Sequence, residues 1–438
     1  MSRALRIDLR RSPAVAVGLL VLAFGLAGMY LLSGAEWAGR WTAMALTVRL
    51  YLGFMWPVTL AGGCWLTGRD RRGRVGELFA STARPGWQRV LSPATALTIA
   101  TSGGYLLVIA ACVPLVADTA TYFHPAVVGI LAVGLLSLLA AGLLGMAAGR
   151  LLPSRLTAPT LAVLGLMYVV SISFVNYFDA ERMQSTVLLL TPQLNTMFQD
   201  FVIVPSRFTA GQALWFAALA GAGFLLLAAR GRRARAAAVV LPLVAAAVAV
   251  PLLPRSEGLH AAARLDPGAT ALVCAPGTPR VCVRRAHAVL LPEVVPLGRQ
   301  ALARLAVLPD PPTSVVEAVS YPGSPLGTER PGPDEVSFSA YLDRERRLAD
   351  PGSLLLELLA GGGAPACVRM SDDDYAARQA AGYWLAGQAP ADADEGAETW
   401  RALTALPADE QARRVGDLRR AALRCAPDLT AVLVGRRG

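Results

Sequence analysis

Long apolar runs fill the first 254 residues of the chain and are separated by shorter polar connections. A helix of about 20 apolar residues is long enough to cross the hydrocarbon core of a bilayer. Seven runs reach roughly that length, and they predict seven membrane-spanning helices. The predicted spans are 13–33, 44–67, 92–116, 125–149, 157–177, 211–229 and 236–254.

Residues 255–438 carry shorter patterns, typical of a mixed α/β domain. Ser371-Asp-Asp-Asp374 has the form of a capping box that begins a helix. The predicted fold class is therefore a polytopic α-helical membrane domain followed by a mixed α/β domain. The predicted strands are 270–274, 281–284 and 314–320, and the predicted helices are 292–308, 371–385 and 408–424.

The net charge of +10 is high for a sequence with a mean hydropathy of +0.47. A basic protein suggests a nucleic-acid partner, but these arginines are distributed as in a membrane protein. With the N-terminus inside, the inner connections hold 16 Arg and the outer connections hold 3. The asymmetry predicts a multi-pass protein of the cell membrane that contacts lipid and no nucleic acid. Its N-terminus is then cytoplasmic and residues 255–438 are extracytoplasmic, unless the span 236–254 fails to cross.

Four of the six cysteines lie in the C-terminal region, and Cys64 and Cys112 lie within predicted spans. An even number of cysteines in an exported domain suggests disulfides. Cys274 and Cys282 flank a turn, so we expect them to close a hairpin and leave Cys367 to pair with Cys425. Two other connectivities, or unpaired thiols in a cytoplasmic domain, remain alternatives. The seven-residue spacing of the first pair is not a zinc signature, so no metal site is expected.

The inner connection 68–91 is much longer than a simple link between two spans requires. Its charged start, short amphipathic stretch and second basic group predict a short helix on the inner membrane surface. One interpretation is an interfacial helix whose arginines contact anionic lipid. The other is a docking helix for a cytoplasmic protein. The residues that define the segment are Arg71, Arg72, Arg74, Glu77, Leu78, Phe79, Arg84 and Arg89.

The outer connection 178–210 is too apolar for a solvated loop. Two short apolar pieces within it predict short helices that dip into the outer leaflet and are separated by a break at Pro192. Asn195 and Phe198 belong to the second piece. A pair of true spans is the alternative, but each piece falls short of the roughly 20 residues that a span needs.

These features resemble the permease subunit of type-2 ABC transporters: six spans, a long basic inner loop and short outer re-entrant helices. The inner-loop motif of that family is matched by Gly76 and Glu77, the apolar Leu78 and Phe79, the Arg84-Pro85 turn and Arg89. The resemblance implies that this loop docks onto a cytoplasmic ABC ATPase subunit. It covers about residues 1–229.

The resemblance also implies how the chain is organised and what it works with. Residues 1–229 would form a six-span permease domain, 230–254 a seventh span and 255–438 an extracytoplasmic α/β domain. The permease would form a homodimer or pair with a related permease, and it would export an unknown substrate. The seventh span and the large exported domain depart from the minimal family pattern.

The chain lacks the motifs of the common enzyme classes. It contains no lysine, so a Walker A motif cannot occur, and ATP and Mg would be bound by the partner ATPase rather than by a cofactor site here. H-E-x-x-H and G-x-S-x-G are also missing, which predicts that the chain is not an enzyme. The alternative function is a membrane-anchored receptor or assembly factor that acts through its extracytoplasmic domain.

Ionisable groups within membrane spans are candidates for function. Arg49 lies in the second predicted span, where it either extends to the outer surface or pairs with an acidic group on a translocation path. Asn176, near the outer end of the fifth span, is a second candidate for that path. Gly145 and Gly149 form a GxxxG spacing, which allows two helices to approach closely.

Overall fold

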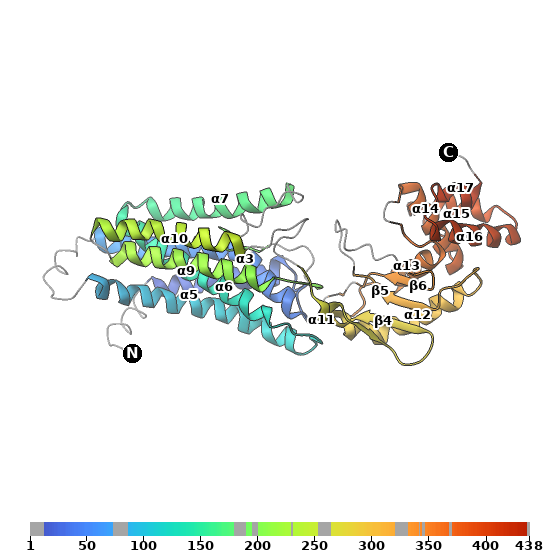
Figure 1. Ribbon diagram of the computed structural model, residues 1–438, viewed down its shortest axis with the longest axis horizontal. Helices are drawn as coiled ribbons and strands as arrows, with labels where there is room; N and C mark the ends of the chain where they lie inside the picture. The colour runs from blue at the N-terminus through green and yellow to red at the C-terminus, as the bar shows by residue number, and fades with distance from the viewer. Residues whose placement is uncertain are drawn as a thin grey trace. The chain divides into compact units, whose positions relative to one another are not determined.

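The chain divides into two compact units, Met1–Asp266 and Pro267–Gly438, and each is described by itself. The first unit is a bundle of long apolar helices, and the second combines a small sheet with helices (Figure 1). The computed structural model describes residues 13–72, 86–178, 190–194, 200–228, 231–252, 264–319, 332–340, 342–343, 347–367 and 370–435.

Six helices of the described chain are long and apolar enough to cross a membrane, so the first unit is a polytopic helical membrane unit as predicted. A further helix, α7 (Thr157–Phe178), matches the predicted span 157–177. Its fully described part, Thr157–Ile172, is apolar but shorter than the six helices. The crossing of all seven segments stays a prediction. The six are α2 (Ala14–Leu26) with its π-helical continuation η1 (Ala27–Leu32), α3 (Trp41–Arg72), α5 (Gly86–Ala117), α6 (Ala126–Leu151), α9 (Ser206–Ala228) and α10 (Arg232–Leu252).

Glycines let the backbones of α3 and α6 touch. A β-carbon added at Gly145 would overlap the carbonyl oxygen of Leu60, and one at Gly149 would overlap that of Cys64. Thr67 Oγ1 donates to the carbonyl of Met146 across the same seam, at 2.7 Å. The GxxxG spacing therefore marks a close helix–helix contact. Because the contacts follow both helices in the same order, α3 and α6 run parallel.

The connections of the bundle gather at two opposite ends. At one end, Gly39 N donates to Leu115 O (3.0 Å), and the Trp41 and Phe123 rings meet edge to face. This end, called the strand end, holds residues 33–40, 118–125, 200–205 and 264–266. The other, called the arginine-rich end, holds residues 69–72, 86–89, 150–156 and 231–235.

A short strand at the strand end corrects one prediction. Residues of the second predicted re-entrant helix form β1 (Val202–Ile203), which pairs antiparallel with β2 (Arg264–Leu265). β-Branched residues favour extended backbone, and Pro205 disfavours helix in the residue before it. The break at Pro192 is present: Leu190 is helical and residues 191–194 are not. Asn195 and Phe198 lie outside the described residues.

The second unit is built on a four-stranded sheet of order β3-β4-β5-β6. The first pair of strands is antiparallel and the other two pairs are parallel. Three strands coincide with predicted ones, whereas β6 was not predicted. The strands are β3 (Leu272–Cys274), β4 (Arg280–Arg284), β5 (Ser314–Glu317) and β6 (Glu335–Phe338).

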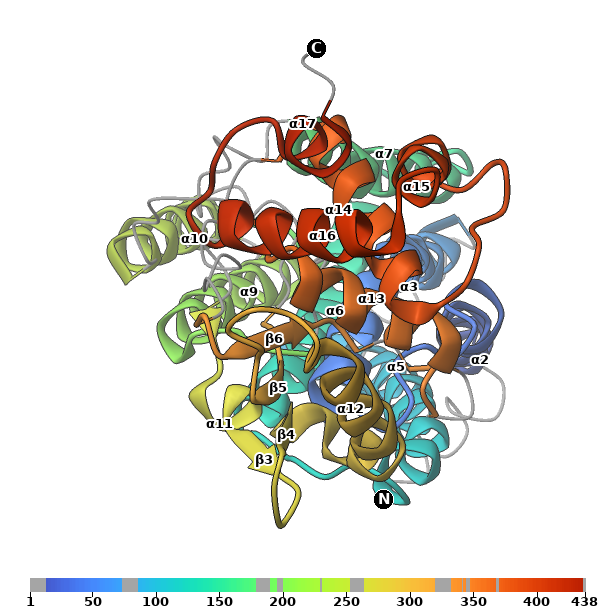
Figure 2. The ribbon, with the colours of Figure 1, turned by 90° about the vertical axis from the view of Figure 1, so that its right-hand side faces the viewer.

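Helices cover this sheet and extend beyond its β6 edge (Figure 2). α12 packs on β4 and β5, α13 packs on β6, and α14 to α17 cluster against α13 and one another around a shared apolar core. α12, α14 and α16 coincide with predicted helices. The helices are α11 (Pro267–Thr270), the 3-10 helix η2 (Arg285–Leu290), α12 (Leu291–Leu305), α13 (Pro351–Gly363), α14 (Asp372–Ala386), α15 (Ala397–Thr404), α16 (Ala408–Leu423) and α17 (Leu429–Val434).

Two disulfides join the cysteines of the second unit in the predicted pairing. Cys274 and Cys282 lie directly opposite each other on β3 and β4, with Cα atoms 4.0 Å apart. Cys367 and Cys425 connect the segment after α13 to the end of α16. Cys64 and Cys112 are buried in the membrane unit and belong to neither disulfide.

The predicted capping box begins α14, and it also ties that helix to α17. Ser371 Oγ accepts from Asp374 N (3.1 Å), and Asp374 Oδ2 accepts from Ser371 N (3.3 Å). The other carboxylate oxygen of Asp374 accepts from Leu429 N at 2.8 Å. Partial burial acts to raise the pKa of Asp374, but the hydrogen bonds from Leu429 and Ser371 outweigh it, so the pKa is lowered.

Replacing Asp374 by alanine is expected to destabilise the second unit by about 1 kcal/mol at neutral pH, because two backbone donors lose their acceptor. A lowered folded-state pKa means that the carboxylate stabilises the unit above its unfolded pKa, about 3.9, and loses this effect as pH falls through the lower folded value. Thermal unfolding between pH 7 and pH 2, values chosen roughly to bracket that transition, should show the difference from wild type shrinking in acid. Asp373→Ala is the control in the same turn; equal pH dependence in both variants would contradict the assignment.

Candidate functional site

Arg49 is the one charged side chain of α3 that lies in the bundle interior among the described residues, and only 1% of it is exposed. Removing a guanidinium from water is costly unless its donors are satisfied. Its burial contradicts the interpretation in which Arg49 extends to the outer surface. The side chain is therefore held inside the bundle by specific partners.

Within the described chain, the guanidinium of Arg49 donates three hydrogen bonds. Nε donates to the carbonyl of Pro192 (2.9 Å), Nη1 to the carbonyl of Ile130 (3.1 Å) and Nη2 to Oε1 of Gln212 (2.9 Å). All three acceptors are neutral, and no carboxylate of the described chain forms an ion pair with Arg49. Carbonyl oxygens thus hold Arg49 within the described chain, and an acidic partner on a translocation path stays a prediction.

Gln212 extends the same network from α9. Its Nε2 donates to the carbonyl of Thr191 at 3.1 Å, next to the Pro192 carbonyl that Arg49 holds. Proline has no N–H and cannot donate a backbone hydrogen bond. The carbonyl groups near Pro192 therefore need other donors in an apolar region. Arg49 and Gln212 supply those donors from two different helices. Together they attach residues 190–194 to the bundle.

Gly134 on α6 makes room for this network. A β-carbon there would lie 3.0 Å from Cδ of Arg49 and would overlap the hydroxyl of Tyr105. That hydroxyl, contributed by α5, donates to the carbonyl of Leu131 at 3.2 Å. Four helices, α3, α5, α6 and α9, therefore converge on one buried polar cluster, which we call the Arg49 cluster: Arg49, Tyr105, Gly134, Thr191, Pro192 and Gln212.

Polar contacts also hold the strand end together. Arg40 forms an ion pair with Asp200. Asp266 N donates to the carbonyl of Phe201 (2.8 Å), and the Tyr122 hydroxyl donates to Asp266 Oδ1 (3.0 Å). The chain segment that leaves the bundle is thus fixed at the strand end before the second unit begins.

The structure places only some of the other predicted site residues. Arg71 and Arg72 belong to the end of α3, and Arg89 to the first turn of α5, so both helices continue into the predicted surface segment 68–91. Asn176 lies near the end of α7, where no side chain is described. The docking-loop residues Arg74, Glu77, Leu78, Phe79 and Arg84 lie outside the described residues.

Tyr105, Thr191 and Gln212 were not identified from the sequence. Gln212 carried the clearest signal, because an uncharged amide inside a membrane helix also needs a hydrogen-bond partner. Tyr105 carries no charge at neutral pH and Thr191 lies outside the predicted spans, so neither gave a comparable signal.

A buried His–Glu contact in the second unit has a structural explanation. His287 Nδ1 contacts Glu317 Oε1, and the backbone N–H of Arg284 donates to Glu317 Oε2 at 2.6 Å. Arg284 Nε also donates to the carbonyl of Glu317 (2.8 Å), so the group joins β4, η2 and β5. Among the described residues, no three His, Cys, Asp or Glu side chains are grouped so that they could hold a metal ion.

Comparison with known proteins gives no match to any family model, curated protein or solved structure.

Proposed function

We propose that this chain is the membrane-spanning permease subunit of an ATP-driven ABC transporter, working as an exporter with a separate cytoplasmic ATPase. Support comes from the arrangement of the bundle, whose arginine-bearing connections gather at one end. Under the positive-inside rule that end faces the cytoplasm. The chain leaves the bundle at the opposite, strand end, so the second unit would lie outside the cell.

The lengths of α3 and α5 support a docking role for the arginine-rich end. Each helix has 32 residues. A helix of that length measures about 48 Å, whereas the hydrocarbon core is about 30 Å thick. For α3 the excess lies at the arginine-rich end, because Cys64 and Thr67 already lie beside the last turns of α6. Helices that continue into the docking segment would transmit movement of a docked ATPase to the bundle interior.

Such a movement would act on the bundle interior at the Arg49 cluster. It joins α3 and α5, which lead to the docking segment, with α6, α9 and residues 190–194 near the strand end. A second permease, either another copy or a related chain, would complete a translocation path. The substrate would be set by that path and by the second unit.

Charge reversal in the docking segment tests the proposal. We expect Glu77→Arg and Arg84→Glu each to reduce co-purification with the cognate ATPase at least about tenfold, the effect of losing one interfacial charge pair. ATP-driven transport in proteoliposomes should fall in parallel. Arg155→Glu is the matched control, since it reverses an exposed charge in another connection of the same end.

Co-purification and transport that survive both substitutions would overturn the proposal. That result would favour the receptor or assembly-factor alternative, in which the helices serve as an anchor.

A further inference from the structure

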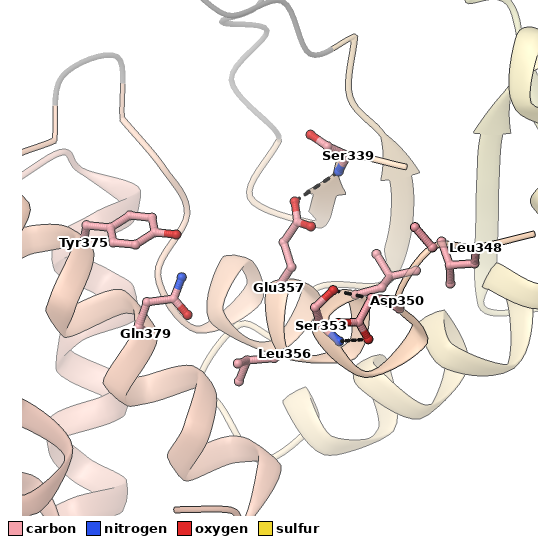
Figure 3. A pocket seen from close by; sticks show the side chains of 10 residues that line it. Ser339, Leu348, Asp350, Ser353, Leu356, Glu357, Tyr375 and Gln379 are labelled. Atoms are coloured by element: carbon pink, nitrogen blue, oxygen red, sulfur yellow. Dashed lines mark hydrogen bonds between the residues drawn. The ribbon is translucent and has the colours of Figure 1, made fainter. Parts of the chain in front are cut away.

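A pocket of about 300 Å³ opens in the second unit between α13 and α14 (Figure 3). Its volume is at the lower end of the range for small-molecule sites. The end of β6 and the loop before α13 complete its wall. The polar residues that line it are Ser339, Asp350, Ser353, Glu357, Tyr375 and Gln379.

Three side chains in this pocket have unused hydrogen-bonding capacity. Glu357 Oε1 accepts from Ser339 N at 3.1 Å, and its second oxygen has no hydrogen bond within the described chain. The Tyr375 hydroxyl and the Gln379 amide point from α14 toward the space beside Glu357 (Figure 3). Neither is hydrogen-bonded to another described residue. Convergent polar groups of this kind orient a ligand.

Asp350 adds a second carboxylate at the rim. Its Oδ1 caps α13 by accepting from Gly352 N (2.9 Å) and Ser353 N (3.1 Å), which fixes the side chain in place. Described lining residues include no arginine or histidine. Glu357 and Asp350 are therefore the charged groups among the described lining residues.

Arg378 on α14 offsets the charge of Glu357 on α13 only in part. The two side chains interact electrostatically but form no ion pair within 4.0 Å in the described chain. Burial raises the pKa of Glu357 more than the Ser339 hydrogen bond and Arg378 lower it. Glu357 therefore lacks a full positive counter-charge in the described chain. A cation bound beside it would supply that charge.

We propose that this pocket binds the protonated amino group of a small primary alkylamine. The ammonium would donate to Glu357 and to the oxygens of Tyr375 and Gln379, which matches its three donors. The short alkyl stem would lie against Leu348 and Leu356, which form part of the apolar wall. This site does not depend on the proposed transport activity.

Binding of n-butylammonium to the full-length protein in detergent tests the site, with saturation-transfer NMR as the measurement and 1-butanol and butyrate as isosteric probes. We expect saturable binding of the ammonium and at least tenfold weaker binding of the other two. Glu357→Gln should weaken ammonium binding about tenfold or more, because it removes a charge-assisted hydrogen bond without changing shape. Glu398→Gln, the same change at an exposed position of α15, should leave binding unchanged.

Tyr375→Phe provides a second variant that keeps the ring and removes only the hydroxyl. We expect it to weaken binding several-fold, and hydrogen exchange in α13 and α14 would show that both variants are folded. Equal binding of ammonium and butanol, or ammonium binding that is unchanged in both variants, would overturn the proposal.

Discussion

Replacing Gly145 by leucine is expected to prevent α3 and α6 from packing and to leave the membrane unit unfolded or greatly destabilised. A β-carbon at this position would overlap the carbonyl oxygen of Leu60, and its next nearest atoms also belong to the backbone of Leu60. Backbone atoms of a helix cannot move aside as the end of a flexible side chain can. We therefore expect a cost of about 3 kcal/mol or more, at the upper end of overpacking effects.

Thermal unfolding in detergent, followed by size-exclusion chromatography, measures this effect. On the scale of a domain of this size, such a loss lowers Tm by roughly 6–12 °C. Gly103→Leu on α5 is the matched control, since no described atom outside its own stretch of helix lies within 4 Å of the position that its β-carbon would take. If the two variants unfolded at the same temperature, the α3–α6 seam would not be the close contact described here.

The helices of the membrane unit were predictable from the sequence, but their ends were not. An apolar run marks the part of a helix that lies in the membrane. Hydropathy therefore located the middle of α3 and of α5 but not their ends. Arg71 and Arg72 end the apolar pattern of α3, yet arginine is a good helix former, and the helix continues through both residues. The strand at Val202–Ile203 was missed because its partner, β2, lies beyond α9 and α10 in the chain, so no local pattern indicates the pairing.

In the second unit, α13 shows why local rules alone were insufficient. The helix ends in Gly361, Gly362 and Gly363, a run that predicts a break by propensity. A β-carbon at Gly362 would overlap the side chain of Leu305 on α12. Packing therefore decides the helix here. The cysteine pairing, by contrast, was predictable, because a hairpin brings Cys274 and Cys282 together locally.

Partners of the buried arginines could not be predicted because they are mainly backbone carbonyls. Arg49 bonds to the carbonyls of Pro192 and Ile130, and Arg419 in the second unit bonds to those of Asp310, Gly362 and Pro333. Every residue has a carbonyl, so no residue type marks the partner. A rule for charge pairs points to carboxylates, whereas the described partners of Arg49 are neutral carbonyl oxygens.

Replacing Arg49 by methionine is expected to release residues 190–194 from the bundle. The change keeps most of the side-chain volume but leaves the Pro192 carbonyl and Gln212 Oε1 without the donors that now satisfy them. Two buried acceptors without donors cost about 2–6 kcal/mol. Arg49→Lys should recover only part of this loss, because an ammonium cannot reproduce the planar fork that reaches three acceptors in different directions.

Hydrogen exchange of residues 190–194 measures the release, and Arg155→Met, the same change at an exposed position, is the control. Gln212→Leu should raise exchange in the same segment, and the double variant should add less than the sum of the two, since both side chains hold adjacent carbonyls.

The exchange measurement also separates two roles for Arg49. If the arginine instead contacted substrate on a translocation path, Arg49→Met would abolish transport while exchange at 190–194 stayed as in the wild type. Faster exchange together with weaker transport would show that Arg49 acts by holding this segment in place.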